Sequence, residues 1–333
     1  MEKQKIEIST TTLLKIAVIV LGLWLIYLIK EVVILFIFVL IIVAALDPII
    51  DWFEVRKIPR PASIVLVYIV IFSLFGLLVY LVMPPLISQI IQLAQDAPLY
   101  FHKLQALGEA ASGWQKALLS VSSQLSKLTG GLWQATLTIF GGLVSFLTVI
   151  FLSIYMLWEE RGIKKSLINF WPEHKKEQIS FLFNKVETKL GGWLQGQLIL
   201  CLIIGIVTYI GLLIMKVPYA LVLAILAAVL EIIPYFGPII AGIMAILVAY
   251  FLGGGVWQAV AVLILYVVVQ QIESQILVPK IMQKSVGLSP VIIILALLIG
   301  AKLLGLVGII LAIPVAAGLS VLIAEWPNLR KTE

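Results

Sequence analysis

The sequence predicts an all-α polytopic membrane protein. Of its 333 residues, 62% are hydrophobic and 12% are charged, whereas a soluble domain carries about 25% charged residues. Apolar runs recur along the whole length, and short polar segments separate them. Several runs fall short of the roughly 20 helical residues that cross a bilayer. We therefore expect about eight transmembrane helices, with one or two broken or re-entrant helical hairpins.

The apolar runs define the expected membrane elements in chain order. The first four cover residues 13–29, 32–50, 62–83 and 142–158. The next four cover residues 193–215, 219–233, 239–252 and 256–278, and a short pair, 291–301 and 303–323, is joined at Lys302. Proline lacks a backbone N–H and clashes with the preceding helical turn. The third run is therefore expected to stop at Pro84 and the eighth at Pro279.

Two segments are expected outside the bilayer. In residues 84–130, apolar side chains from Tyr100 to Leu128 recur at alternating steps of four and three, the spacing of a heptad seam. This pattern favours either a helix packed on a neighbouring subunit or an amphipathic helix on the protein's own membrane domain or on the lipid interface. Residues 159–192 mix both charge signs and predict solvated amphipathic helices.

The basic residues predict the orientation. Short loops rich in Lys and Arg stay on the cytoplasmic side of a membrane. Such residues cluster in 51–60, 159–189, 280–284 and 330–331. This distribution places both termini in the cytoplasm and residues 84–130 outside. Because the net charge of +6 is concentrated in these loops, it indicates membrane orientation and not a nucleic-acid partner.

The most informative stretch surrounds Glu231, a carboxylate between two apolar runs. Pro234, Gly237 and Pro238 follow it and predict a helix break. Backbone carbonyls freed at membrane depth are tolerated only where protein or a water-filled cavity covers them. An ionisable residue beside a discontinuous helix is typical of a transport site. The alternative is a helical turn at the membrane surface, with Glu231 solvated or capping a helix.

A second polar stretch lies just before Pro279. Gln270 and Glu273 are three residues apart and share one helix face. A polar cluster inside a membrane segment costs several kcal/mol unless its groups find partners, so we expect this face to point into the helix bundle. The alternative is a polar helix end in water, near Lys280. Gln197, at the start of the fifth run, is a third polar group.

These residues suit ion or solute binding better than catalysis. Two carboxylates with nearby amides and free carbonyls are suited to a proton or a small hard cation such as Na⁺, bound transiently at Glu231 and Glu273. Gln197, Gln270 and Tyr235 are candidate donors to a polar solute. The sequence has no zinc-protease helix motif, no Cys/His cluster and no nucleotide-binding glycine loop. We therefore expect neither an enzyme nor a resident metal or cofactor, with Na⁺ or H⁺ as the coupling ion.

The motifs together resemble the autoinducer-2 exporter (AI-2E) family of bacterial and archaeal transporters. The resemblance rests on EIIPYFGP at 231–238, the polar stretch 270–279, Gly196-Gln197 and GLVGIILAIP at 305–314, and it covers most of the chain. It implies a permease of the cytoplasmic (inner) membrane that assembles as a homo-oligomer. Members are described as exporters of the quorum-sensing signal autoinducer-2 or as sodium/proton antiporters. Two family motifs are matched, one by Glu231, Pro234, Gly237 and Pro238 and the other by Gln270, Glu273 and Pro279.

Three functions follow as expectations for residues 1–333, taken as a single membrane transport domain. The first is a secondary-active permease that exports a small polar solute, such as autoinducer-2, coupled to an ion gradient. In this reading Glu231 and Glu273 bind the ion, and the break at Pro234, Gly237, Pro238 and Pro279 supplies hinges. The second is a sodium(lithium)/proton antiporter. The third is a non-transporting oligomeric scaffold. The expected partners are the lipid bilayer, a small polar solute or monovalent cation, and further copies of the chain.

Overall fold

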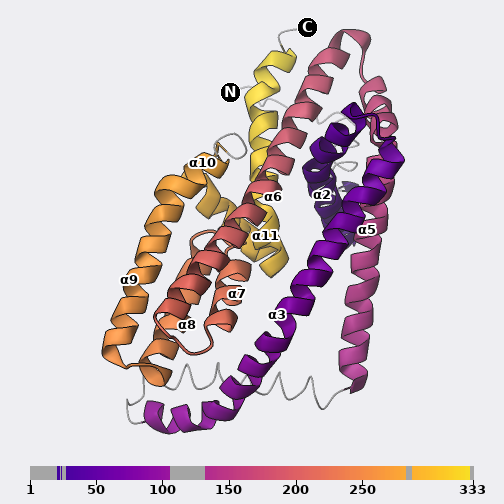
Figure 1. Ribbon diagram of the computed structural model, residues 1–333. Helices are drawn as coiled ribbons and strands as arrows, with labels where there is room; N and C mark the ends of the chain where they lie inside the picture. The colour runs from indigo at the N-terminus through magenta and orange to yellow at the C-terminus, as the bar shows by residue number, and fades with distance from the viewer. Residues whose placement is uncertain (1–20, 23, 25–27, 106–131, 283–286, 331–333) are drawn as a thin grey trace, which may run out of the picture.

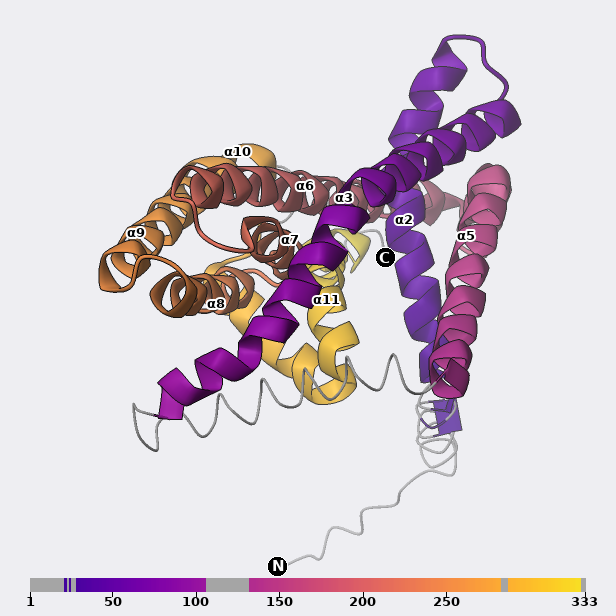
Figure 2. The same cartoon turned by 60° about the horizontal axis from the view of Figure 1, so that its bottom comes forward.

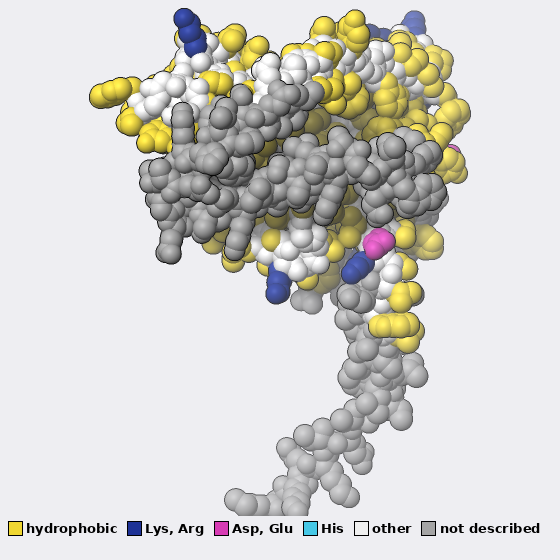
Figure 3. All heavy atoms as spheres, turned by 90° about the horizontal axis from the view of Figure 1, so that it is seen from below, with side chains coloured by type: hydrophobic (Ala, Val, Ile, Leu, Met, Phe, Trp, Pro, Cys, Tyr) yellow, Lys and Arg dark blue, Asp and Glu magenta, His cyan; other side chains and the backbone are white. Residues whose placement is uncertain are grey.

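The computed structural model is helical throughout the residues it describes, which are 21, 22, 24, 28–105, 132–282 and 287–330 (Figure 1). Within these ranges there is no β-strand, and five helices are long and apolar enough to cross a membrane. Hydrophobic side chains far outnumber charged ones on the described part of the face in Figure 3. The prediction of an all-α polytopic membrane protein is therefore confirmed. The first expected span lies largely outside the described residues, so the total of about eight spans stays a prediction.

The first half of the chain supplies a group of three long helices. They are α2 (Lys30–Val55), α3 (Arg60–Gln105) and α5 (Leu132–Asn169). An apolar core that includes Val39, Ile64 and Leu157 joins them. Within that core, the hydroxyls of Tyr68 and Ser153 form a 2.6 Å hydrogen bond between α3 and α5. The runs expected at 32–50 and 142–158 fall inside α2 and α5.

The expected stop at Pro84 is wrong. Helix α3 continues through Pro84 and Pro85 and ends at Gln105. A proline within a helix removes one backbone hydrogen bond and bends the axis, but neighbouring packing can carry the chain onward. Figure 1 shows α3 changing direction toward its C-terminal end. The later heptad positions, in residues 106–131, lie outside the described residues.

The second half of the chain is built around a long helix and two hairpins. Its elements are α6 (Glu173–Ile214), α7 (Ala220–Leu230), α8 (Phe236–Leu252), α9 (Val256–Ile272), the π-helix η2 (Glu273–Leu277), α10 (Val278–Met282) and α11 (Pro290–Arg330). Helices α7 and α8 have 11 and 17 residues, fewer than a membrane crossing needs. Ala220 and Leu223 share a buried core with Ala245 and Ala249, so α7 and α8 form the expected broken hairpin.

Helix α11 contains the second hairpin. Gly305 has φ 60° and ψ −136°, which interrupts the helix in a region of backbone conformation that favours glycine. The two arms meet closely, because a Cβ added to Gly300 would lie 2.3 Å from the carbonyl oxygen of Gly308. Figure 2 shows α11 folding back on itself. The predicted joint at Lys302 is thus confirmed to within three residues.

Arg60 holds the charged ends of α2, α3 and α5 together. Its side chain is 11% exposed, pairs with Asp47 at 2.5 Å and with Asp51 at 2.8 Å, and also pairs with Glu160. Glu160 lies just beyond the expected fourth span. Burial and the adjacent Asp47 carboxyl raise the pKa of Glu160 to about 8. The shift toward the neutral form eases the repulsion between the two carboxyl groups that share the Arg60 guanidinium.

Replacing Arg60 by methionine is expected to destabilise this helix group by roughly 2–4 kcal/mol, because Asp47 and Glu160 would lose their cation while staying largely buried. The measurement is thermal unfolding of the purified protein in detergent. Arg161→Met is the matched control, since the Arg161 side chain is 67% exposed and its removal should cost less than about 1 kcal/mol. Equal effects of the two substitutions would contradict the role assigned to Arg60.

Candidate functional site

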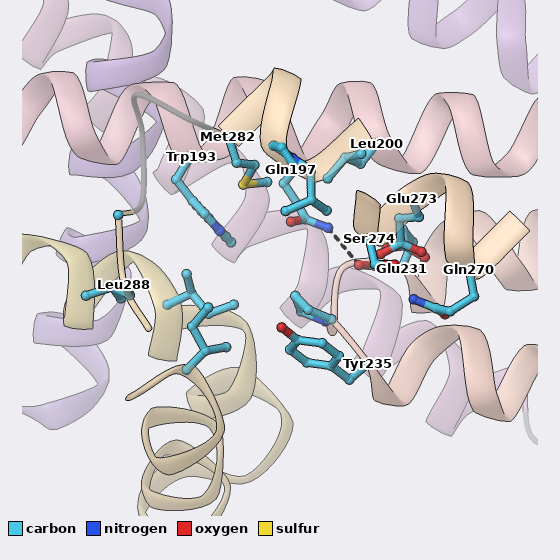
Figure 4. A pocket seen from close by; sticks show the side chains of 16 residues that line it. Trp193, Gln197, Leu200, Glu231, Tyr235, Gln270, Glu273, Ser274, Met282 and Leu288 are labelled. Atoms are coloured by element: carbon cyan, nitrogen blue, oxygen red, sulfur yellow. Dashed lines mark hydrogen bonds between the residues drawn. The ribbon is translucent and has the colours of Figure 1, made fainter. Parts of the chain in front are cut away.

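A cavity of about 300 Å³ lies where the two hairpins approach α6 and the end of α9 (Figure 4). Polar and apolar side chains occupy different ends of it. The polar group includes Gln197, Glu231, Gln270, Glu273 and Ser274, and the apolar group includes Met282, Leu288, Ile293 and Ile313. All five predicted binding residues therefore line one cavity, because Tyr235 also borders it.

Glu231 lies at the C-terminal end of α7, and 1% of its surface is exposed. Its backbone carbonyl is freed by the helix break. The side-chain amide of Gln197 donates a 2.7 Å hydrogen bond to that carbonyl from α6. The alternative of a solvated Glu231 in a surface turn is therefore wrong. The burial of Glu231 matches the prediction of a helix break inside the protein.

The break itself depends on Tyr235, which lies between α7 and α8, and on two residues in the first turn of α8. Tyr235 has φ 68° and ψ −46°, a strained conformation for a residue with a side chain. Gly237 is buried, and a Cβ there would lie 2.0 Å from the carbonyl oxygen of Leu230. Pro238 falls in the first turn of α8, where a missing N–H leaves no helical bond unmade. Of the predicted hinge residues, Pro234 and Pro279 line the cavity, whereas Gly237 and Pro238 are not among its lining residues.

Glu273 lies at the start of the π-helix and is 5% exposed. The backbone N–H of Val278 donates to the carbonyl of Glu273, five residues earlier. The expected stop at Pro279 is wrong, because helical structure continues to Met282. A widened turn relieves the contact between a proline ring and the preceding turn, and such π-turns are frequent at functional sites. The alternative of a solvated helix end is also wrong for Glu273, given its burial.

Glu231 and Glu273 form a buried carboxyl pair, and Figure 4 shows the two side chains side by side. A proton or a cation shared by the two groups would relieve the repulsion between two buried carboxylates. The Oε2 atom of each residue is buried and has no hydrogen-bond partner among the described residues. None of the described residues that line the cavity is Lys, Arg or His. The pair is therefore an acceptor-rich site that can take a proton or a cation.

Sequence reasoning missed Trp193 and Ser274, which also line the cavity. Trp193 precedes Gln197 by four residues on α6, and residues four apart share a helix face. That spacing was the available signal, but an apolar ring at the start of a membrane run is indistinguishable from ordinary core packing. The apolar residues contributed by α11 are brought in only by its folded-back hairpin.

A buried carboxyl pair beside a discontinuous helix, in a chain of long apolar helices, defines a membrane transporter. Comparison with known proteins agrees: the family model described as "AI-2E family transporter" matches residues 14–328. The chain belongs to the AI-2E transporter family. It is accordingly a multi-pass membrane transporter, and the resemblance noted in the sequence is confirmed.

Its relatives carry transport names. The chain is 30% identical to the Bacillus subtilis (strain 168) protein named "Putative transport protein YrrI", over 85% of this chain and 83% of that protein. It is also 30% identical to "Putative transport protein YueF" of the same organism, over 81% and 78% of the two chains. A relative from Halobacillus andaensis, 25% identical over 80% of this chain and 82% of its own, is named "Sodium-lithium/proton antiporter".

Replacing Gly237 by alanine is expected to displace the break between α7 and α8, since the added Cβ would meet a backbone carbonyl at 2.0 Å. Overpacking of this kind costs about 1–3 kcal/mol, and we expect most transport activity to be lost. The readout is flux in proteoliposomes together with thermal unfolding. Gly254→Ala is the control, because its Cβ would lie at an ordinary 3.4 Å from Gln258. Full flux in Gly237→Ala would show that the break tolerates rearrangement.

Proposed function

We propose that this protein is a secondary-active transporter in which Glu231 and Glu273 bind the coupling ion. The observation that carries the proposal is the buried carboxyl pair with two unpartnered oxygens. A buried negative charge is costly unless a cation or a proton compensates it. Because the described cavity lining offers no basic side chain, the compensating charge has to enter from solution. That requirement links occupancy of the site to an ion gradient.

The cavity volume supports a small polar solute as the cargo. A volume of about 300 Å³ corresponds to roughly ten water molecules at 30 Å³ each, more than a dehydrated monovalent cation fills. Gln270 and Tyr235 border this space and are able to hydrogen-bond a hydroxylated molecule. Export of a small polar signal of the autoinducer-2 kind, driven by the ion bound at the carboxyl pair, is our first proposal.

Sodium(lithium)/proton exchange is the second candidate. It is supported by the carboxyl pair itself, since a proton and a cation would compete for the same oxygens. The name of the Halobacillus andaensis relative supports it too. The scaffold hypothesis depended on the heptad pattern, most of which lies outside the described residues, and on the charged segment 159–192 as a surface for partners. We retain as proposals the homo-oligomeric state, the cytoplasmic membrane and the cytoplasmic location of both termini.

Glu231→Gln is the decisive variant, because it preserves shape and removes the charge that attracts the coupling ion. Proteoliposomes with an internal pH dye and an imposed pH gradient are given sodium, lithium or potassium. We expect cation-dependent collapse of the gradient in the wild type and a rate close to that of empty vesicles in Glu231→Gln. Glu173→Gln, at a side chain 88% exposed on α6, is the matched control and should behave as wild type.

Wild-type flux in Glu231→Gln would overturn the assignment of the coupling site. If no cation affects the gradient in the wild type, the antiporter candidate fails. The same vesicles are then loaded with autoinducer-2, and its efflux is followed under a proton gradient in both variants. Efflux that requires Glu231 would support the first proposal.

A further inference from the structure

The indole of Trp193 carries a buried hydrogen-bond donor that the protein leaves unused. Trp193 is 3% exposed, and its Nε1 atom has no hydrogen-bond partner among the described residues. Figure 4 shows the ring entering the cavity, opposite the end that holds Glu231 and Glu273. Buried donors are almost always paired, and an unpaired one is destabilising. An unpaired donor that borders a cavity indicates a ligand with an acceptor atom.

The surrounding structure fixes this donor in place. Trp193 packs in a buried core with Ile41 of α2 and with Leu297 and Leu311 of α11. Close packing on these sides prevents the ring from turning toward another partner. Around it, the cavity wall is apolar, formed by Met282, Leu288, Ile293 and Ile313. The indole N–H is thus an isolated donor in an apolar wall, an arrangement that fixes the orientation of a small molecule.

A transported inorganic cation cannot accept a hydrogen bond from the Trp193 N–H. The ion itself is drawn to the carboxyl oxygens at the other end. Water molecules bound to a cation direct their oxygen atoms toward the ion and their hydrogens outward, so they seek acceptors. Trp193 Nε1–H is a donor only. Its partner has to be an oxygen with a free lone pair, such as the hydroxyl, carbonyl or ether oxygen of an organic solute.

We propose that Trp193 donates a hydrogen bond to an acceptor oxygen at one end of a small organic solute, whose other end presents hydroxyl or ammonium hydrogens to Glu231 and Glu273. Trp193 is then a specificity-determining residue, which disfavours solutes that bring only donors to its end of the cavity. This inference rests on the proposed function, because it assigns the cargo that shares the cavity with the coupling site.

Two probe molecules isolate the effect of the acceptor oxygen. Aminobutanol and putrescine share an ammonium group and a four-carbon chain, but the second end is a hydroxyl in aminobutanol and a donor-only ammonium in putrescine. Dissociation constants come from the rise in the melting temperature of the full-length protein with probe concentration. Trp193→Phe keeps an aromatic ring and removes the N–H. Trp257→Phe is the matched control, at a position on α9 that is 84% exposed.

The quantity to compare is the ratio of the two dissociation constants, putrescine over aminobutanol, because changes of cavity volume affect both probes alike. We expect Trp193→Phe to lower this ratio at least about fivefold, the equivalent of one neutral hydrogen bond. Trp257→Phe should leave it unchanged. An unchanged ratio in Trp193→Phe would overturn the inference, since the N–H would then serve only internal water.

The flux assay separates this inference from the proposed function. If neither probe binds while cation-dependent proton flux persists and requires Glu231, the inference about Trp193 fails by itself and the coupling site stands. If Glu231→Gln transports at the wild-type rate, the coupling site fails, whatever the probes do. Both proposals stand together only if the Trp193→Phe ratio falls and the flux depends on Glu231.

Discussion

The structure depends on one constraint, that backbone polar groups at membrane depth need partners inside the protein. The break between α7 and α8 frees the carbonyl of Glu231, and the amide of Gln197 on α6 satisfies it at 2.7 Å. Gly237 allows the two arms to meet with the backbone of Leu230 close by. Without the Gln197 hydrogen bond and the close approach at Gly237, the chain would have to continue as a helix. Glu231 would then not be held beside Glu273.

The hairpin geometry also explains why the cavity has two unlike ends. The α7–α8 hairpin and the π-helix bring carboxyl groups to one end, and the α11 hairpin brings aliphatic side chains to the other. Trp193 and Gln197 lie one helical turn apart on α6, so each end receives one polar group from the same helix face. A long helix thus sets the spacing between the carboxyl end of the cavity, where we propose that the ion binds, and the end that contains Trp193.

The sequence predicted those parts of the cavity in which a residue differs in type from the apolar residues around it. Glu231 and Glu273 stand out because charges are rare in apolar runs, and the breaks stand out because Pro and Gly change the allowed backbone. The continuation of the helix through Pro279 was not predictable, since it depends on a π-turn. The continuation through Pro84 was not predictable either, because a proline can bend a helix without ending it. Trp193 was missed because its role depends on what lies across the cavity, and periodicity cannot show that.

A comparison of two carboxyl pairs in the described part of the chain bears on the proposed function. At the charged ends of α2, α3 and α5, the structure brings Asp47 and Glu160 together and supplies Arg60 to neutralise them. At the cavity it brings Glu231 and Glu273 together and supplies no cation from the described lining residues. A fold that compensates one carboxyl pair internally can do so at the other. The contrast supports our proposal that the compensating charge at the second pair comes from solution, since exchange of that charge is what a transporter has to couple to the movement of its cargo.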